Sequence, residues 1–468
     1  MTRLVRLALL AALVALVAPG AALAAPRMWM GFQDDPYFRW LPERFYMRDR
    51  AMQANATVMK TTVYWFNVAP RRPSNGANPF DPAYRWEDLD EFVRQAEDRD
   101  IEAMFTIWGT PNWAGSAKNR SPRRLSDLTN FARALSTRYS GRYRGFPYVR
   151  FYSVWNEPNL GLFLMPQYDA KGRSIVGNVY AKLYRAAYSG LKAGSPTAQV
   201  AIGETSARGR DRKKVGVSDT HSPGKFAELL SKSRPKVRFD AYAHHPYSSP
   251  ANQPPTQLVR WPNVSMTTLP RLGKMLDKWF RRKNTPIWLT EYGHETRPED
   301  PRGVTYSQQA AYLRTAVSMA RRNARIQMLV WFIMRDNPVS LWQSGLLTIG
   351  GLEKPAFDLF SVVAKPVDAR NAITTVKAGA PSPAVRVPTT KLGYRSGAGS
   401  QVGITYKVFE RGRLLVVEQP VVRIALDGWI TLRPRFTPLR GRTYQLQVEA
   451  GDVNGNKVQR TLTLIGVR

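Results

Sequence analysis

The chain has 468 residues, of which 43% are hydrophobic and 11% aromatic, so it can bury a large core and is neither collagen-like nor wholly disordered. It has no cysteine, which excludes disulfides, thiolate metal sites and a cysteine nucleophile. Lys and Arg number 69 against 35 Asp and Glu, a net charge of +34 that suits an acidic polymer, an anionic lipid surface, nucleic acid, or simply a solvated basic surface.

The N-terminal segment predicts export. Arg3 and Arg6 precede an apolar run over residues 7–18, and Ala22-Leu23-Ala24 is a small-x-small cleavage site. The run is shorter than the roughly 18–20 apolar residues that span a bilayer, so we expect a signal peptide over residues 1–24 and no stable membrane insertion after cleavage. The mature protein is then secreted or associated with the cell wall.

Strand-like and helix-like segments alternate from residue 25 to about residue 365. The expected strands are Met28–Phe32, Thr57–Phe66, Glu102–Trp108, Tyr148–Trp155, Ala198–Gly203, Phe239–His244, Ile287–Thr290 and Met328–Ile333. Apolar residues spaced by three and four predict helices over Trp86–Asp98, Leu125–Tyr139, Val179–Lys192, Leu269–Arg282 and Ser307–Arg322.

Alternating strands and helices predict a parallel sheet, and eight repeats predict a closed (β/α)8 TIM barrel over residues 25–365. An open, doubly wound sheet is the competing topology, but it normally carries a glycine-rich phosphate loop after its first strand, and none is present.

The pattern changes at residue 366. Short alternating runs replace the helices, at Gly403–Phe409, Leu414–Val417, Trp429–Arg433, Tyr444–Ala450 and Lys457–Leu464, with a linker at residues 378–383. Residues 366–468 therefore predict a linker and a small antiparallel β-sandwich, similar to bacterial immunoglobulin-like modules. We expect it to support the barrel structurally.

Two glutamates stand where predicted barrel strands end, the edge at which barrels carry their chemistry. Glu157 follows the fourth strand in Trp155-Asn156-Glu157-Pro158, and Glu291 ends the seventh in Ile287-Trp-Leu-Thr-Glu291. Burying an unpaired carboxylate is costly, so two in such places indicate function. Glycoside hydrolysis requires such a pair, one to protonate the leaving oxygen and one to attack the anomeric carbon or activate water. Spacing alone does not say which does which.

These motifs, in this order, resemble glycoside hydrolases of clan A over residues 28 to about 365. His244-His245-Pro246-Tyr247 is similar to the clan's His-x-Tyr, and Trp331 stands where the clan has a sugar-stacking tryptophan. The segment Gly109-Thr110-Pro111-Asn112-Trp113 looks like family 39 more than family 5, and Gly345-Leu346-Leu347 with Lys354-Pro355-Ala356-Phe357 also looks like such sequences.

The resemblance implies a retaining mechanism. Glu157 would be the general acid/base and Glu291 the nucleophile, with carboxylates roughly 5–5.5 Å apart. Asn156 would bind the sugar 2-hydroxyl and Tyr247 would donate to Glu291. An adjacent histidine pair could bind a metal, but a metal site needs further ligands at fixed geometry, and the clan uses no metal or other cofactor, so we expect none.

Other residues are weaker candidates. His245 is expected to serve the site, whereas His244 is equally compatible with a structural role, and His294 is expected at the rim. Glu204, which ends the fifth strand, suits either a substrate contact or an ion pair with Arg208. The clan's arginine on the second strand has no secure match; Lys60 lies early in that strand. Aromatic rings suit a glycan cleft, so we expect substrate contacts from Trp108, Trp113 and Trp331, with Trp65 as a further candidate. One of residues 32–35, which end the first strand, is also expected to touch substrate.

The sequence therefore predicts a secreted, retaining O-glycoside hydrolase that acts on a poly- or oligosaccharide and works as a monomer. The net positive charge favours an acidic glycan as its substrate. A transglycosylase uses the same intermediate and stays open, as does a non-catalytic glycan-binding protein on the same barrel. Nucleic acid is not an expected partner, because the basic residues form no recognition motif and the protein is exported.

Overall fold

The computed structural model describes residues 28–99, 101–143, 146–340 and 342–364, and, further along the chain, 373–377, 384–386, 400–419, 421–424, 429–432, 436–451 and 457–467. The predicted signal peptide and the linker at residues 378–383 lie outside this part of the chain. Within it, no helix is both long and apolar enough to cross a membrane.

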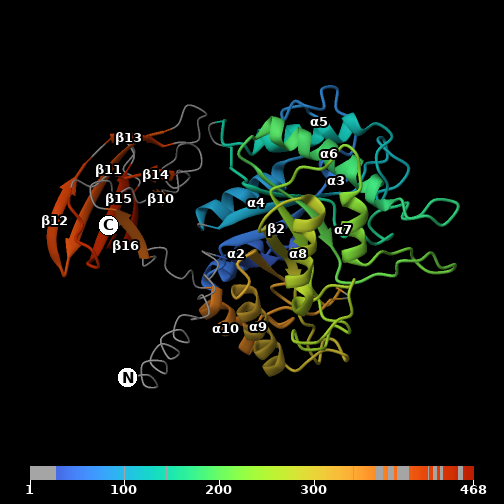
Figure 1. The fold of residues 1–468 in the computed structure, drawn as a ribbon. Helices are drawn as coiled ribbons and strands as arrows, with labels where there is room; N and C mark the ends of the chain where they lie inside the picture. Colours follow the sequence, from blue (N-terminus) through green and yellow to red (C-terminus); the bar gives the residue numbers. More distant parts are fainter. Residues whose placement is uncertain are drawn as a thin grey trace, which may run out of the picture.

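Eight parallel strands close into a barrel in the order β1 to β8, which confirms the predicted fold (Figure 1). They are β1 Trp29–Gln33, β2 Val58–Tyr64, β3 Glu102–Trp108, β4 Phe151–Val154, β5 Gln199–Thr205, β6 Ala241–His244, β7 Ile287–Tyr292 and β8 Ile326–Phe332. The strands are buried almost throughout, as expected for a sheet covered on both faces.

The barrel interior is packed by residues of alternating size. The rings of Phe151 and Trp288 meet edge to face at 5.3 Å, and Trp29 packs on Phe151 at the same separation. The alanines of β5 and β6 in the same cluster, Ala201 and Ala241, leave room for these rings. Aromatic side chains therefore fill the N-terminal part of the barrel, and the polar side chains gather at its other end.

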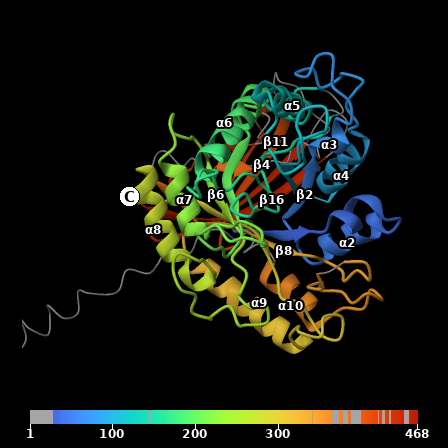
Figure 2. The same cartoon turned by 90° about the vertical axis from the view of Figure 1, so that its right-hand side faces the viewer.

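Helices surround the barrel (Figure 2). They are α2 Arg44–Gln53, α3 Trp65–Val68, α4 Glu87–Asp98, α5 Leu125–Arg138, α6 Val176–Gly194, α7 Pro223–Ser231, α8 Leu269–Phe280, α9 Tyr306–Arg321 and α10 Pro355–Ala364. The five predicted helices are present. Sequence periodicity missed four short helices, α2, α3, α7 and α10. Helix α3 begins within the predicted strand Thr57–Phe66, α7 begins with Pro and Gly, and α10 has few polar residues to mark an outer face.

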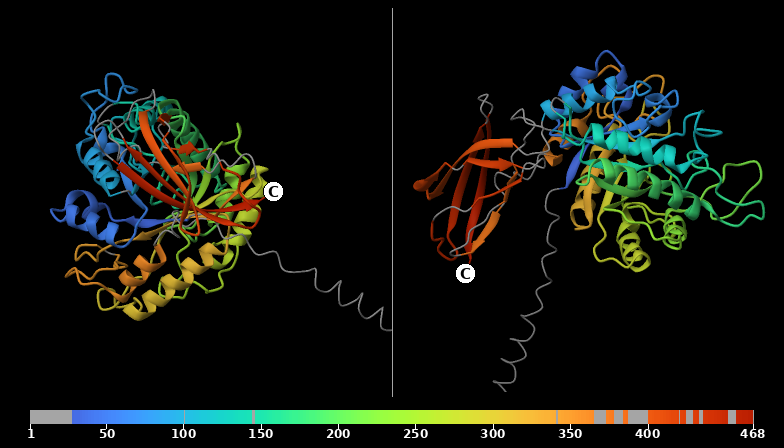
Figure 3. Two further views of the ribbon diagram at one scale, coloured as in Figure 1. Left: turned by 90° about the vertical axis from the view of Figure 1, so that its left-hand side faces the viewer. Right: turned by 90° about the horizontal axis from the view of Figure 1, so that it is seen from above.

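The C-terminal strands form a separate β structure, as predicted (Figure 3). They are β9 Ile373–Lys377, β10 Ala384–Arg386, β11 Ser400–Glu410, β12 Arg413–Glu418, β13 Val421–Ile424, β14 Trp429–Thr431, β15 Thr443–Gly451 and β16 Lys457–Val467. One sheet has the order β12-β11-β15-β16-β9 with β13 beside β11, and β10 pairs with β14. The expectation of a purely antiparallel structure was wrong at one place, because β9 pairs with β16 in parallel.

Alternation gives this second unit its own core. Along β15, buried Tyr444, Leu446 and Val448 alternate with exposed residues, and Ile404 and Leu464 on the neighbouring strands pack with them. Each apolar side chain thus points to one face of the sheet, the pattern expected of a strand with one buried face.

Candidate active site

The two predicted catalytic glutamates meet at the C-terminal end of the barrel. One carboxylate oxygen of Glu157 and one of Glu291 lie within 4.8 Å of each other. Glu157 stands one turn past β4, and its backbone N–H donates to the carbonyl of Glu204 at 2.9 Å. Glu291 lies within β7. The parallel barrel therefore brings together two carboxylates that are 134 residues apart in sequence, since Glu157 and Glu291 sit at neighbouring ends of its strands.

His245 links these two carboxylates. Its Nδ1 lies 3.0 Å from Glu157 Oε1 and 3.4 Å from Glu291 Oε2, while Nε2 lies 3.4 Å from Glu204 Oε2. Burial of the ring opposes its charge, but the negative charge of Glu291 and the hydrogen bonds to Glu157 and Glu204 prevail and raise the pKa of His245 to about 9. At neutral pH the imidazole is a cation between three carboxylates.

Lys60 supplies the second cation. Its Nζ lies 3.3 Å from Glu291 Oε1 and 3.1 Å from Glu204 Oε1, and the side chain is fully buried. Burial lowers its pKa, yet the adjacent charges of Glu204 and Glu291 outweigh this and leave the pKa above the ordinary value. Sequence reasoning noted Lys60 without giving it a role. The available signal was a lysine inside an otherwise uncharged, buried strand, which needs a charged partner.

Glu204 is the third carboxylate, and it is fully buried. It accepts hydrogen bonds from Thr106 and Ser153 at 2.9 and 2.8 Å and another from Thr290. Burial raises its pKa, but Lys60 and His245 lower it further, so the carboxylate stays ionised with a pKa well below the ordinary value. Its ionic partners are therefore Lys60 and His245, and the expected pair with Arg208 is not formed.

A cavity of about 580 Å³ opens above these groups. Tyr247 lines it and donates from its hydroxyl to Glu291 Oε2 at 3.4 Å, as the resemblance implies. Asn156 and Trp108 also line it, together with Phe163 from the loop that follows Glu157. Apolar rings beside a few polar groups form the kind of lining that binds small organic ligands such as sugars.

Trp331 requires a correction. Its side chain is fully buried, its Nε1 donates to the carbonyl of Ser344 at 2.8 Å, and it does not line the cavity. Trp342, eleven residues further on, lines the cavity instead and packs against Tyr247 with 5.1 Å between ring centroids. The strand places alternate residues on opposite faces, so Trp331 points toward the helix layer, and the loop supplies the ring that sequence reasoning missed.

Other predicted contacts also lie away from the cavity. Trp113 donates to the carbonyl of Ala69 at 2.7 Å, under the guanidinium of Arg72, and Trp65 is buried against Phe131. His294 is buried rather than at the rim.

The remaining histidines are held neutral by burial. The ring nitrogens of His294 contact Tyr292 and the carbonyl of Ala251, and burial lowers the pKa of His294 to about 4. His244 contacts Thr205 and the carbonyl of Val264, with its pKa lowered to about 3 by burial. The structural role of His244 is thus the one that the geometry supports.

The residues that end β1 do line the cavity. Asp34 accepts from the backbone N–H groups of Met334 and Arg335 at 3.0 and 3.1 Å, and burial raises its pKa to about 7. Asp35 accepts from Thr61 at 2.5 Å. Both carboxylates are thus engaged with protein groups, whereas Gln33 also lines the cavity. Phe32 is buried in the core.

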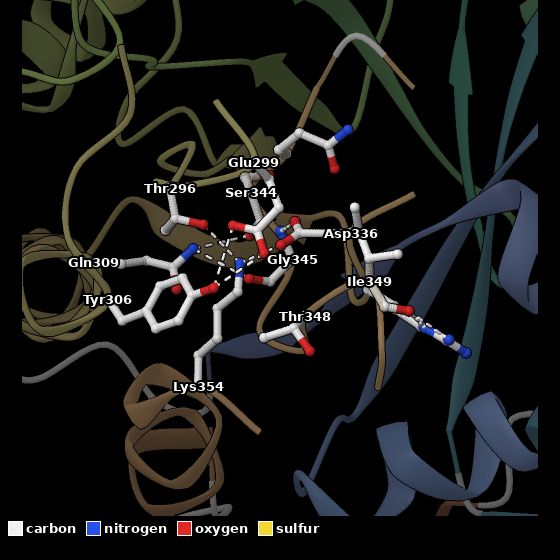
Figure 4. A network of polar contacts seen from close by, with 12 residues as sticks. Thr296, Glu299, Tyr306, Gln309, Asp336, Ser344, Gly345, Thr348, Ile349 and Lys354 are labelled. Atoms are coloured by element: carbon white, nitrogen blue, oxygen red, sulfur yellow. Dashed lines mark hydrogen bonds and ion pairs between the residues drawn. The ribbon is translucent and has the colours of Figure 1, made fainter. Parts of the chain in front are cut away.

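A buried ion pair anchors the loop that carries Trp342 (Figure 4). Lys354 contacts the carboxylate of Asp336 and donates to Thr296 at 2.7 Å, and both members of the pair are fully buried. The other oxygen of Asp336 accepts from the N–H of Gly345 at 2.8 Å. The Gly345 and Lys354 motifs noted in the sequence therefore fix the loop after β8 from inside.

The electrostatics oppose a metal at the catalytic pair. His245 Nδ1 and the nearest oxygens of Glu157 and Glu291 lie close enough together to hold an ion. A histidine ligand must be neutral, whereas the carboxylates around His245 hold its proton. Lys60 already occupies the other side of Glu291. Catalysis without a metal stays a prediction.

Replacing each tryptophan by alanine should separate their roles. We expect Trp331→Ala to lower the free energy of unfolding by about 3–5 kcal/mol, because it empties a fully buried site. Trp342→Ala should cost less than half as much, since its ring is partly exposed at the cavity. Chemical denaturation of both variants measures the difference, and equal losses would contradict this assignment.

Comparisons with known proteins agree with the barrel fold and with the resemblance to glycoside hydrolases. The sequence model of the family described as glycosyl hydrolases family 39 matches residues 83–388, about two thirds of the chain. A sequence search of functionally curated proteins finds no match.

Solved structures share the barrel at low sequence identity. A family 39 glycoside hydrolase from the gut symbiont Bacteroides cellulosilyticus WH2 is similar with 17% identity and a TM-score of 0.50, over 87% of this chain and 81% of that one. GH5_18 from Streptomyces cattleya, in complex with GlcNAc, is similar with 14% identity and a TM-score of 0.51, over 76% of this chain and 86% of that one. These two likenesses support the fold, and the family model supports the rest: the chain belongs to glycosyl hydrolases family 39 and is a glycoside hydrolase.

Proposed function

We propose that this glycoside hydrolase cleaves O-glycosidic bonds of a poly- or oligosaccharide with retention, through a covalent glycosyl-enzyme intermediate. The observation that carries the proposal is the pair Glu157 and Glu291, whose nearest oxygens lie within 4.8 Å. Retaining enzymes hold their carboxyl groups about 5–5.5 Å apart, and inverting enzymes need a wider gap for water. The short separation here supports the retaining arrangement.

The surroundings support different roles for the two glutamates. Glu291 receives Lys60 Nζ at 3.3 Å and the Tyr247 hydroxyl at 3.4 Å, so its charge is balanced and its orientation fixed, as a nucleophile requires. Glu157 has only His245 within ion-pair distance, among the described residues, and lines the cavity. It protonates the leaving oxygen in the first step and, as a carboxylate, activates water in the second. Asn156, also at the cavity, binds the sugar 2-hydroxyl.

Substitutions should separate the two carboxylates. Glu291→Gln should abolish turnover of every substrate, because the covalent step is lost. Glu157→Gln should lower kcat by about 10²–10⁴-fold on natural glycans. With an aryl glycoside whose leaving group needs no proton, it should accumulate the glycosyl-enzyme instead. Mass spectrometry of the intermediate and NMR of the first-formed anomer measure both steps.

Matched folding controls accompany these assays, since both variants must show wild-type thermal unfolding. An inverted first product would contradict the retaining mechanism, and near-wild-type turnover by either variant would contradict its role. Longer oligosaccharides in place of hydrolysis products would identify a transglycosylase, and binding without turnover by the wild-type protein would identify a non-catalytic glycan-binding barrel.

We also propose that the substrate is an acidic glycan. Arg208 is exposed, lines the cavity and has no ionic partner among the described residues, its guanidinium contacting only the Ser249 hydroxyl. The same loop between β5 and α7 carries four further exposed cations, Arg210, Arg212, Lys213 and Lys214. An arginine at a cavity lip can bind a carboxylate or sulfate through two parallel hydrogen bonds.

Arg208→Gln should raise KM about 10-fold for a uronic-acid glycan and leave KM unchanged for the same glycan after carboxyl reduction. The matched control is Arg314→Gln, which removes the same charge from an exposed site on α9, away from the cavity. Equal effects of the two variants would mean that Arg208 acts only through the overall positive charge of the protein. A preference of the wild-type enzyme for the carboxyl-reduced glycan would overturn the acidic-substrate proposal.

We further propose that the enzyme is exported after removal of residues 1–24 and acts as a monomer outside the cytoplasm or at the cell wall. The support is the basic start, the short apolar run and the Ala-Leu-Ala site in the sequence. Expression of the full chain should yield exported protein whose intact mass corresponds to a chain that begins at residue 25. Light scattering should give the molar mass of one chain. Recovery of the full-length chain in the cytoplasmic fraction alone would contradict the proposal.

A further inference from the structure

The double-displacement mechanism uses two carboxylates, but three are present in this site. Glu204 is fully buried and does not line the cavity, so it does not touch a substrate that enters there. Its contacts lead to the catalytic pair on both sides. Lys60 lies between Glu204 and Glu291, at 3.1 and 3.3 Å from the nearest oxygens. His245 lies between Glu204 and both Glu157 and Glu291.

The charges of this cluster do not cancel when all groups are ionised. Three carboxylates, Glu157, Glu204 and Glu291, face two cations, Lys60 and His245. The sum is −1, and it becomes zero when one carboxylate binds a proton. Glu204 accepts three hydrogen bonds from hydroxyl groups as well as both ionic contacts, so it is the best stabilised anion. The proposed reaction requires a proton on one member of the catalytic pair, and a proton there would bring this sum to zero.

Backbone geometry ties Glu204 to the acid/base as well. Glu204 has a φ of 48°, in the left-handed region, and follows Gly203 at 106°. The pairing of β5 with β6 shifts register between Ile202 and Thr205 at this point. The resulting bend turns the carbonyl of Glu204 toward the N–H of Glu157, which donates to it at 2.9 Å. The main-chain carbonyl of Glu204 thus contacts Glu157 directly, and its side chain reaches Glu291 through Lys60.

We propose that Glu204 is a positioning residue that keeps one proton on the catalytic pair, by holding Lys60 and His245 as cations shared between itself and that pair. The proposal rests on the proposed function of Glu157 and Glu291. Without the negative charge of Glu204, the two cations would balance Glu157 and Glu291 as two carboxylates, and the general acid would be lost.

Removing that charge has a defined direction. A negative charge favours protonation of every group near it, so Glu204→Gln must weaken proton binding by its neighbours. The titratable groups that face Glu204 come from several elements: Lys60 on β2, Glu157 after β4, His244 and His245 at β6, Glu291 on β7 and Tyr180 on α6. His245 and Lys60 contact it directly. At such distances we expect shifts of about one pH unit.

The first test needs no substrate. The full chain has four histidines, and burial lowers the pKa of His221 and His294 to about 4 and of His244 to about 3, so His245 alone titrates on the alkaline side. NMR of tag-free protein with isotope-labelled histidine follows that one imidazole. Glu204→Gln should move its titration about one unit toward acid. Lys60→Met, which removes a positive charge, should move it toward alkali and serves if Glu204→Gln does not fold.

The second test is the pH profile of kcat/KM on a cleaved glycan. Glu204→Gln should shift the alkaline limb about one unit toward acid, while Glu204→Asp, which keeps the charge, should lower kcat without moving that limb. The matched control is Asp336→Asn, since Asp336 is an equally buried carboxylate beside the buried Lys354 (Figure 4). It should lower stability and leave the limb in place, because it faces neither catalytic glutamate.

The outcomes separate the two proposals. An unmoved imidazole titration in both Glu204→Gln and Lys60→Met overturns the positioning role, whatever the activity. An unmoved alkaline limb in a folded Glu204→Gln overturns it as well and makes the residue structural only. If wild-type protein cleaves no glycan, the proposed function fails, and the imidazole shift still decides whether Glu204 controls the charge of the cluster.

Discussion

Charge pairing inside a closed barrel is the constraint on which this structure depends. Five ionisable side chains meet at the C-terminal end of the strands, and three of them are fully buried: Lys60, Glu204 and His245. Each is tolerable only because an opposite charge and hydrogen-bond donors surround it, since an unpaired buried charge costs several kcal/mol. The threonine and serine hydroxyls on β3, β4 and β7 that contact Glu204 belong to the same requirement. The strand ends are polar because the site is charged.

Strands and loops contribute different residues to this end of the barrel. Lys60 lies in a strand and is paired in register with both neighbouring strands, whereas Glu291 lies where the pairing of β7 with β8 shifts register. Loops carry residues that line the cavity, as Phe163, Arg208 and Trp342 do. The loop after β8 is anchored by the buried ion pair of Asp336 and Lys354. The buried charges thus lie in strands or directly after them, and much of the cavity lining comes from loops.

The sequence predicted the barrel and both glutamates, because strand hydrophobicity is continuous and the Asn-Glu-Pro motif is local. It did not predict which face a side chain takes. Trp331 was expected in the cleft, but one position along a strand decides between the core and the cavity, and the register shift beside β7 is invisible in sequence. Lys60 and Glu204 were noticed singly, but their ion pair joins strands 144 residues apart. Short helices such as α7 lacked the length that makes periodicity visible.

The carboxylate of Asp34 joins the two ends of the barrel domain. Asp34 follows β1, and its carboxylate accepts hydrogen bonds from the backbone N–H groups of Met334 and Arg335, 300 and 301 residues later. β1 also pairs directly with β8 along its whole length. On this side of the barrel, the part of the domain that is synthesised first therefore meets the part that is synthesised last. A nascent chain that stops short of β8 has every group of the charged cluster but no closed wall around it. The contact of Asp34 and the cavity wall thus require the segment after β8 as well as β8 itself.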